Sequence, residues 1–151
     1  MHDRAVIARQ ITKQLLRLIE LEASIELASK PHKIELHLTS QHPSLLIGRH
    51  GQTLDALQDL VVTMTDRVTT ERTPIVLDVA GYRERRRDFL QVLSRRLCQQ
   101  VRQTSKPAST PPLVLSERRI LHELINREPD LQSHSKNHQS GRKTIILQPR
   151  G

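Results

Sequence analysis

The first half of the chain alternates between two spacings of apolar residues. Residues 3–20 have an apolar side chain at every third or fourth position, with Arg and Lys between them, which predicts an amphipathic helix. Residues 24–28 and 34–39 instead alternate apolar and polar side chains on either side of a Lys-Pro-His-Lys turn. That alternation is typical of half-buried strands, so these two segments predict a β-hairpin.

A short helix, a glycine-containing loop and a long helix follow the predicted hairpin. Pro43 opens a helical turn at residues 44–47, and Pro74 precedes an apolar strand at residues 75–79. Between them, apolar residues step by three and four, which predicts a helix with one buried stripe. The predicted stripe consists of Leu54, Leu57, Val61, Met64 and Val68.

The second half predicts another small unit of helices and strands. Residues 82–103 form a basic helix, and residues 104–112, with three prolines, form a loop. We expect a short strand at 113–115, a helix from an N-cap at Ser116 to about Arg127, and strands at 131–135 and 143–148. The predicted buried stripe of the basic helix is Phe89, Leu93, Leu97 and Val101.

The positive charge of the chain is concentrated in its second half. The net charge is +8 over 151 residues. Residues 1–80 have 9 Lys and Arg against 10 Asp and Glu, whereas residues 81–151 have 15 against 6. A basic excess of this size favours a polyanionic partner, and a merely soluble basic surface is the alternative. Because Tyr82 and Phe89 are the only aromatic residues, stacking of bases on aromatic rings can contribute little to binding, and backbone, basic groups and aliphatic surface would have to serve instead.

Several other classes of function find no support in the sequence. No apolar run reaches the length of about 20 residues that spans a bilayer, and the N-terminus has no signal-peptide pattern. A single cysteine, Cys98, fits a reducing compartment, so we expect a cytoplasmic protein. His134, His138 and Cys98 lack further ligands at metal-binding spacing, so we expect no metal and no cofactor. No catalytic cluster is visible, and we expect no enzyme.

Gly48-Arg49-His50-Gly51 separates the two helices of the first half. Glycines have no Cβ, so the backbone there can approach a phosphate and adopt unusual dihedral angles. The helix that follows presents unpaired N–H groups and the positive end of its dipole. Arg49 and His50, between the glycines, are therefore candidate phosphate contacts. A Gly-x-x-Gly tetrapeptide by itself is more often a simple turn.

Arg118 and His122 are four residues apart in the predicted helix of the second half, so they share one face. Two arginines in the first turn oppose the helix dipole, which costs about 0.3–1 kcal/mol each when exposed. A ligand that needs the positive charge would explain this cost. The alternative is structural, with Arg118 in an internal ion pair and His122 half buried.

These motifs resemble two known domains. Residues 1–80, with Leu46-Ile47-Gly48-Arg49-His50-Gly51, resemble a type II KH domain of order α-β-β-α-α-β. The segments Glu117–Glu123, 133–135 and 142–149 resemble an Arg-x-x-x-His (R-3-H) domain, which we assign to residues 81–150 together with the basic helix. With the junction at residues 77–86, the whole chain resembles the Jag (SpoIIIJ-associated) family of KH plus R-3-H proteins. Many of its members have a further domain before the KH unit, which we expect this form to lack.

The resemblance implies an α+β, non-enzymatic binder of single-stranded RNA that acts in post-transcriptional regulation. Single-stranded DNA and a role as a protein-interaction adaptor are the alternatives, and a KH-domain protein or a second copy of the chain is a further possible partner. By the same resemblance, an aliphatic groove beside the loop would hold bases, with Ile34, Ile47 and Leu54 as lining candidates or as plain core. The predicted RNA-binding residues are Gly48, Arg49, His50, Gly51, Arg83, Arg86, Arg87, Arg118, His122, Arg142 and Lys143.

Overall fold

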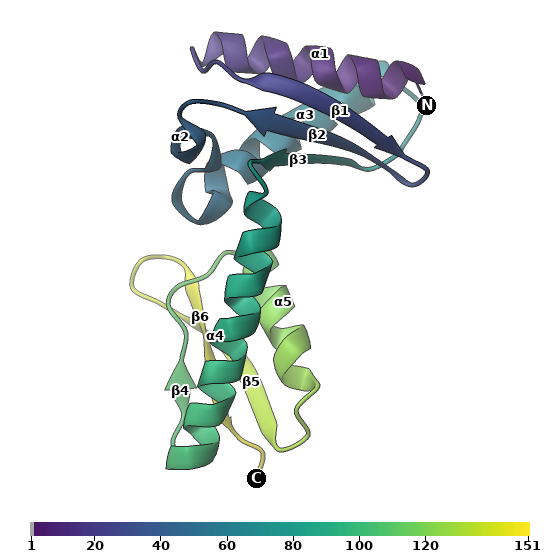
Figure 1. Cartoon of the computed structure of the whole chain (residues 1–151). Coiled ribbons are helices and arrows are strands. Elements are labelled where there is room, and N and C mark those ends of the chain that lie inside the picture. The colour runs from purple at the N-terminus through teal and green to yellow at the C-terminus, as the bar shows by residue number, and fades with distance from the viewer. Residues whose placement is uncertain (1) are drawn as a thin grey trace. The chain divides into compact units, whose positions relative to one another are not determined.

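The computed structural model describes residues 2–151, and it divides into two compact units, Met1–Arg83 and Glu84–Gly151. Each unit has its own hydrophobic core. No helix among the described residues is long and apolar enough to cross a membrane. The predicted α+β class is confirmed in both units (Figure 1).

The first unit has the type II KH order. Its elements are α1 (His2–Leu18), β1 (Ser24–Lys30), β2 (Lys33–Thr39), α2 (Pro43–Ile47), the 3-10 turn η1 (Arg49–Gly51), α3 (Gln52–Val68) and β3 (Ile75–Val79). The sheet order is β1-β2-β3, with β1 antiparallel and β3 parallel to the central strand. Every second residue of β2 is fully buried against the helices: Ile34, Leu36 and Leu38.

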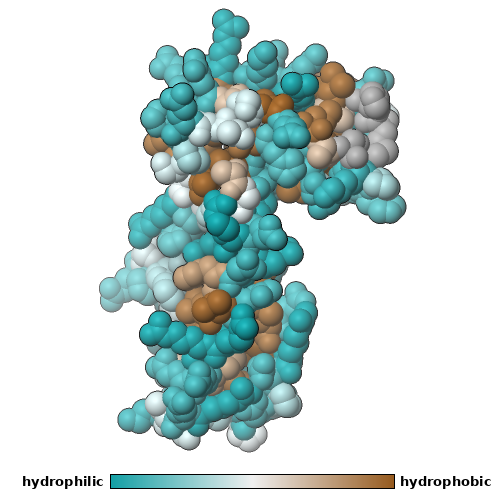
Figure 2. Space-filling view, viewed as in Figure 1, coloured by the Kyte–Doolittle hydropathy of each residue, from teal (hydrophilic) through white to brown (hydrophobic). Residues whose placement is uncertain are grey.

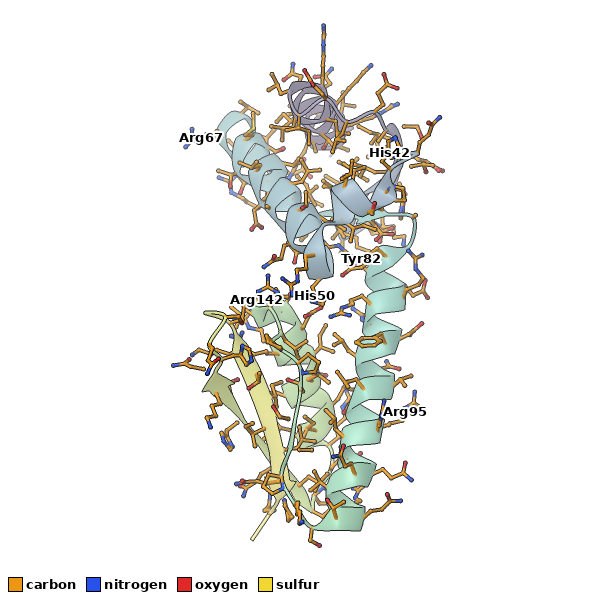
Figure 3. All side chains as sticks on the ribbon, turned by 90° about the vertical axis from the view of Figure 1, so that its left-hand side faces the viewer. His42, His50, Arg67, Tyr82, Arg95 and Arg142 are labelled. Carbon is orange, nitrogen blue, oxygen red and sulfur yellow. The ribbon has the colours of Figure 1, made fainter. Side chains whose placement is uncertain are left out.

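The second unit packs two helices on one side of a three-stranded sheet (Figure 3). Its elements are α4 (Tyr82–Thr104), β4 (Ala108–Ser109), α5 (Leu115–Asn126), β5 (Leu131–Asn137) and β6 (Lys143–Pro149), and α4 begins within the first unit. The sheet order is β4-β6-β5, and all pairs are antiparallel. Ile145 and Leu147 of β6 are fully buried and belong to the core that α4 and α5 share.

Two predicted stripes were wrong in part. Met64 and Val68 of α3 are 38% and 65% exposed, and Phe89 of α4 is 49% exposed. Counting in steps of three and four lets the stripe drift around a long helix, because 3.6 residues make one turn. In α4 the core side is instead occupied by Leu90, which is 1% exposed.

The connection before α5 also differs from the prediction. The strand lies at Ala108–Ser109, and residues 113–115 contribute one isolated bridge between Leu113 and Lys143. The helix begins at Leu115 with Val114 as its N-cap, so Ser116 lies inside the first turn. The N–H of Val114 donates to the Glu117 carboxylate at 3.4 Å, which fixes this earlier start. At the other elements the predicted boundaries differ by a few residues; α1, for example, ends at Leu18, two residues before Glu20 with its φ of 56°.

Candidate nucleic-acid interface

The Gly-x-x-Gly loop has a backbone conformation that needs its glycines. Gly48 and Gly51 have φ values of 70° and 80°, a region that favours glycine, and His50 between them has φ 56° and ψ 30°. A Cβ on Gly48 would lie 2.1 Å from Thr53 Oγ1, and one on Gly51 would lie 2.8 Å from the Tyr82 ring. The two glycines are therefore required by both dihedral angles and space.

The loop leads directly into α3. Arg49 is exposed, His50 is half-buried, and α3 starts at Gln52, so both basic side chains stand at the N-terminal end of that helix. Figure 3 shows His50 and Arg67 at opposite ends of α3. The first turn of a helix has backbone N–H groups without intrahelical partners, and they favour an anion. The loop can therefore offer an anion both backbone donors and a cationic side chain.

The three aliphatic residues suggested for a base-binding groove are mostly core. Ile34 and Leu54 are fully buried, and Ile47 is partly buried against the same core. Leu45 of α2, in contrast, is 56% exposed close to the loop. Leu45 was not among the residues predicted to line the groove. The only available signal was the run Leu45-Leu46-Ile47 in a one-turn helix, where three adjacent apolar residues cannot all face one core.

The Arg83 side chain donates three hydrogen bonds within the first unit. Its Nε donates to the Leu77 carbonyl at 2.7 Å, its Nη1 to Asp55 at 3.0 Å and its Nη2 to the Gln58 side chain at 3.0 Å. Its backbone N–H also donates to Asp78 at 3.0 Å. Arg83 therefore joins α3, β3 and the start of α4, and few of its donors are left for a phosphate.

Arg86 and Arg87 are placed differently although they are adjacent. Arg86 Nε donates to Glu117 at 2.6 Å, and its guanidinium lies 4.7 Å from the centre of the Phe89 ring. Arg87 is exposed and has no hydrogen-bond or ion-pair partner among the described residues. Of the two, Arg87 is the one that an external phosphate can reach.

His122 is held by two serines of β5. Its Nδ1 lies 2.7 Å from Ser133 Oγ, and its Nε2 lies 3.0 Å from Ser135 Oγ. Burial lowers the pKa of His122, and the charges of Arg118 and His134 lower it further. The imidazole is therefore neutral near pH 7, with one ring nitrogen donating and the other accepting.

Arg118 and the backbone of Lys143 both bond to the backbone of Leu113. Arg118 Nη1 donates to the Leu113 carbonyl at 3.0 Å, and the Leu113 N–H donates to the Lys143 carbonyl at 3.0 Å. The structure thus brings the start of α5 beside the start of β6. Arg118 is half-buried, Lys143 is exposed, and Arg142 is half-buried in the turn before β6 (Figure 3).

No metal site is found in the part of the chain that the structure describes. No three His, Cys, Asp or Glu side chains there lie close enough together to hold an ion. The chemistry available at both sites is that of hydrogen-bond donors and positive charge.

Two family models match the chain, and together they cover most of it. Residues 6–77 match the KhpA/KhpB KH domain, and residues 88–148 match the R-3-H domain. The chain belongs to the KH plus R-3-H family. The Gly48–Gly51 loop lies in the KH match and Arg118 and His122 lie in the R-3-H match, whereas Arg83, Arg86 and Arg87 lie between the two.

This chain matches several curated relatives over only part of their length. The KH and R-3-H protein is 29% identical over 126 residues to a protein of Clostridium symbiosum, 33% over 93 residues to one of Bacillus subtilis strain 168, and 27% over 128 residues to one of Streptococcus pneumoniae D39. Each of these relatives is named RNA-binding protein KhpB. The matched regions are 83%, 62% and 85% of this chain, but 57%, 45% and 39% of the relatives.

Proposed function

We propose that this KH and R-3-H protein binds single-stranded RNA through two sites, the Gly48–Gly51 loop and the region of Arg118 and His122. The observation that carries the proposal is the loop itself. Its glycines are required by the geometry, and Arg49 is exposed at the N-terminal end of α3. The name RNA-binding protein, given to the KhpB relatives, supports the same function. Such a protein would act on transcripts in the cytoplasm after their synthesis.

In the first unit, binding would rely on close approach and not on net charge. Residues 1–80 have a net charge of −1, so they attract RNA little at long range. A KH loop clamps the backbone of about four nucleotides. Here the strand would place phosphates against Arg49 and the first turn of α3, and its bases would lie toward the exposed Leu45.

In the second unit, Arg118 would contact phosphate, and His122 would hold the neighbouring strand β5 in place through Ser133 and Ser135. Arg118 uses Nη1 on Leu113, which leaves the remaining guanidinium nitrogens for an external oxygen. Both ring nitrogens of His122 already have serine partners. We therefore expect Arg118→Ala to weaken RNA binding more than His122→Ala, because an arginine donates in a forked geometry that suits phosphate.

The decisive experiment reverses charge in the loop. The double variant Arg49→Asp, His50→Asp should weaken binding of a fluorescein-labelled RNA of about 12 nucleotides and random sequence at least tenfold, because two carboxylates at a helix N-terminus repel phosphate. The matched control is Arg67→Asp, His32→Asp, which makes the same changes at the other end of α3 and in the β1–β2 turn. Both proteins should melt close to the wild type.

Three further arms separate the alternatives. A duplex RNA should bind more weakly than the single strand. The DNA version of the same pool tests the preference for ribose. A denaturing gel tests for cleavage and should show intact RNA after incubation with the protein. If the loop variant and its control bind RNA equally while both stay folded, the KH-loop site is refuted. If wild-type protein binds the DNA pool better than RNA, single-stranded DNA is the ligand.

A salt series tests the contribution of the second unit. Residues 81–151 have 15 basic residues against 6 acidic ones. If about four to six of them meet phosphates, log K against log salt should fall with a slope of roughly −3 to −4, since each single-strand phosphate contributes about −0.7. A slope shallower than about −1 would contradict electrostatic binding by this unit.

A role as a protein-interaction adaptor is the second candidate. The observation that favours it is an apolar pair on the basic helix: Phe89 and Val92 of α4 are 49% and 58% exposed. Figure 2 shows brown surface over this helix. Crosslinking in cells distinguishes the two functions. RNA should be recovered from the wild type and lost from the loop variant, whereas an adaptor would retain its protein partner in both.

A further inference from the structure

The second sheet has a face that no helix covers. Ile145 and Leu147 point to the helices, so the residues that alternate with them on β6, Thr144, Ile146 and Gln148, point to the opposite side. Their direct partners share that side: Lys136 of β5 opposite Thr144, and His134 of β5 and Ser109 of β4 opposite Ile146. We call this surface the outer face. Both helices lie on the other side of the sheet (Figure 3).

The outer face is hollowed at one end. Thr144 and Ile146 form the floor, Ser109 and the Pro111-Pro112 pair border it on one side, and Lys136 borders it on the other. Thr144 is 6% exposed, so it lies deep, while Ile146 is only half-buried and keeps apolar surface open to solvent. Asn137 and Gln139, both exposed, complete the lining at the end of β5.

The charge of the sheet is of one sign. All six acidic residues of residues 84–151 lie in segments 84–103 and 117–130, which are the two helices and the turn after α5. Segments 104–116 and 131–151, which contain all three strands and line the hollow, have no Asp or Glu. Their basic residues are Lys106, Lys136, Arg142, Lys143 and Arg150. A polyanion therefore meets no repelling carboxylate on these segments.

The hollow adjoins the Arg118 and His122 site across a single strand. Ser135, which contacts His122, and Lys136, at the border of the hollow, are consecutive residues of β5 and point to opposite faces. β5 is an edge strand of the sheet. A nucleic-acid strand bound on the helix-facing side can therefore reach the hollow by continuing around this edge of the sheet.

We propose that the hollow on the outer face holds one nucleotide of the RNA strand bound at Arg118. This inference rests on the proposed function and adds a subsite to it. The base lies against Ile146 and the two prolines, the amide of Gln139 meets its polar edge, and Lys136 meets a phosphate. An apolar floor with amide donors and acceptors suits a base better than an acidic peptide, whose side chains offer carboxylates alone.

The test measures RNA affinity of full-length variants across a salt series with the same labelled RNA. Lys136→Glu should weaken binding about tenfold at low salt and make the slope shallower by about 0.7, as expected for one lost phosphate contact. Ile146→Thr, which keeps a β-branched residue in the strand, should weaken binding about threefold and leave the slope unchanged, because it removes no charge. The matched control is Lys106→Glu, an exposed lysine before β4 that does not line the hollow.

Failure of the nucleotide subsite can be distinguished from failure of RNA binding as a whole. If the wild type binds the RNA and Lys136→Glu binds it as well as Lys106→Glu, the hollow is not a nucleotide site, although RNA binding at Arg118 stands. If Ile146→Thr binds as tightly as the wild type, the base contact is refuted. If the wild type does not bind single-stranded RNA at all, the proposed function and this subsite fall together.

Discussion

Glu117 is the residue whose removal should most damage the second unit. Its carboxylate is 6% exposed and accepts a 2.6 Å hydrogen bond from Arg86 Nε. The second oxygen accepts from the Val114 N–H at 3.4 Å, at the start of α5. One side chain thus joins α4 to α5 and satisfies a backbone donor of the first helical turn.

The loss in the free energy of unfolding depends on which hydrogen bonds of Glu117 each substitution removes. Glu117→Gln keeps the shape and an acceptor for Val114 but loses the charge-assisted bond, so it should lower the free energy of unfolding by about 1–2 kcal/mol. Glu117→Ala removes both bonds and leaves Arg86, whose side chain is only 18% exposed, without this carboxylate. Breaking a buried pair in this way costs about 3–5 kcal/mol, and we expect the lower end because Phe89 still contacts the guanidinium.

The assay must report on the second unit alone. The chain has two cores, so a single global melting curve does not give one free energy of unfolding. Native-state amide hydrogen exchange of α5 and β6 resolves the unit directly. Glu123→Ala is the matched control, because Glu123 pairs with Arg127 on the same helix while 70% exposed, and should cost no more than about 0.5 kcal/mol. If Glu117→Ala costs as little as Glu123→Ala, the Arg86–Glu117 pair does not hold the two helices together.

Three other changes test separate parts of the structure. Arg83→Ala should lower the stability of the first unit by about 2–3 kcal/mol, because it removes three internal hydrogen bonds, whereas Arg87→Ala should weaken RNA binding and leave hydrogen exchange unchanged. Gly48→Ala should impair folding of the loop, seen as lost amide protection at the start of α3, since both φ and space are unsuitable for a Cβ. The Arg102 guanidinium holds the pKa of Asp130 at about 2. The contribution of the ionised Asp130 to the free energy of unfolding is therefore complete above the pKa of an unfolded Asp, near 4. It is lost as the pH falls through about 2. Amide protection of α5 and β5, corrected for the intrinsic exchange rate at each pH, should show this loss between about pH 5 and pH 2 in the wild type and not in Arg102→Ala.

The order of elements was predictable because it depends on local spacing. Alternation along residues 34–39 and the three-four steps along α3 were sufficient to give the KH order. β2 begins one residue before its predicted start, and α3 contains the whole predicted stripe. The phase of a stripe depends instead on which neighbours the helix meets. Phe89 and Leu90 are adjacent, and only the packing of α4 on the second core decides that Leu90 is buried.

The short strand β4 shows a second limit. Ala108 and Ser109 have no strand pattern of their own, and they pair with β6, far later in the chain. The segment 113–115, which looked more like a strand, starts a helix because Glu117 reaches back to Val114. Contacts between distant segments overrode local preference in β4, and a side-chain contact within the first helical turn did so at Val114.

The candidate binding residues also divide into those whose role depends on local backbone and those whose role depends on contacts with distant segments. The sequence identifies which residues are positive, but not which guanidinium groups are already occupied. Arg83 donates to Asp55, Gln58 and Leu77, which are 28, 25 and 6 residues away in the sequence. No local sequence pattern predicts these three hydrogen bonds. Gly48 and Gly51 were predictable because their role depends on their own backbone, whereas the outer face could be recognised only once β4, β5 and β6 were placed side by side.

The distribution of ion pairs supports the proposal that the sheet of the second unit binds a polyanion. Internal pairs join arginines of α4 and of the end of α5 to carboxylates of α5 and the turn after it: Arg86 with Glu117, Arg102 with Glu128 and Asp130, and Arg127 with Glu123. These pairs neutralise charge where the helices meet and where α5 ends. The strands have no acidic residue, so their cations have no carboxylate partner within their own segments. Acidic residues here stabilise the helical layer, and their absence from the strands leaves the sheet positive, which favours the approach of a chain of phosphates.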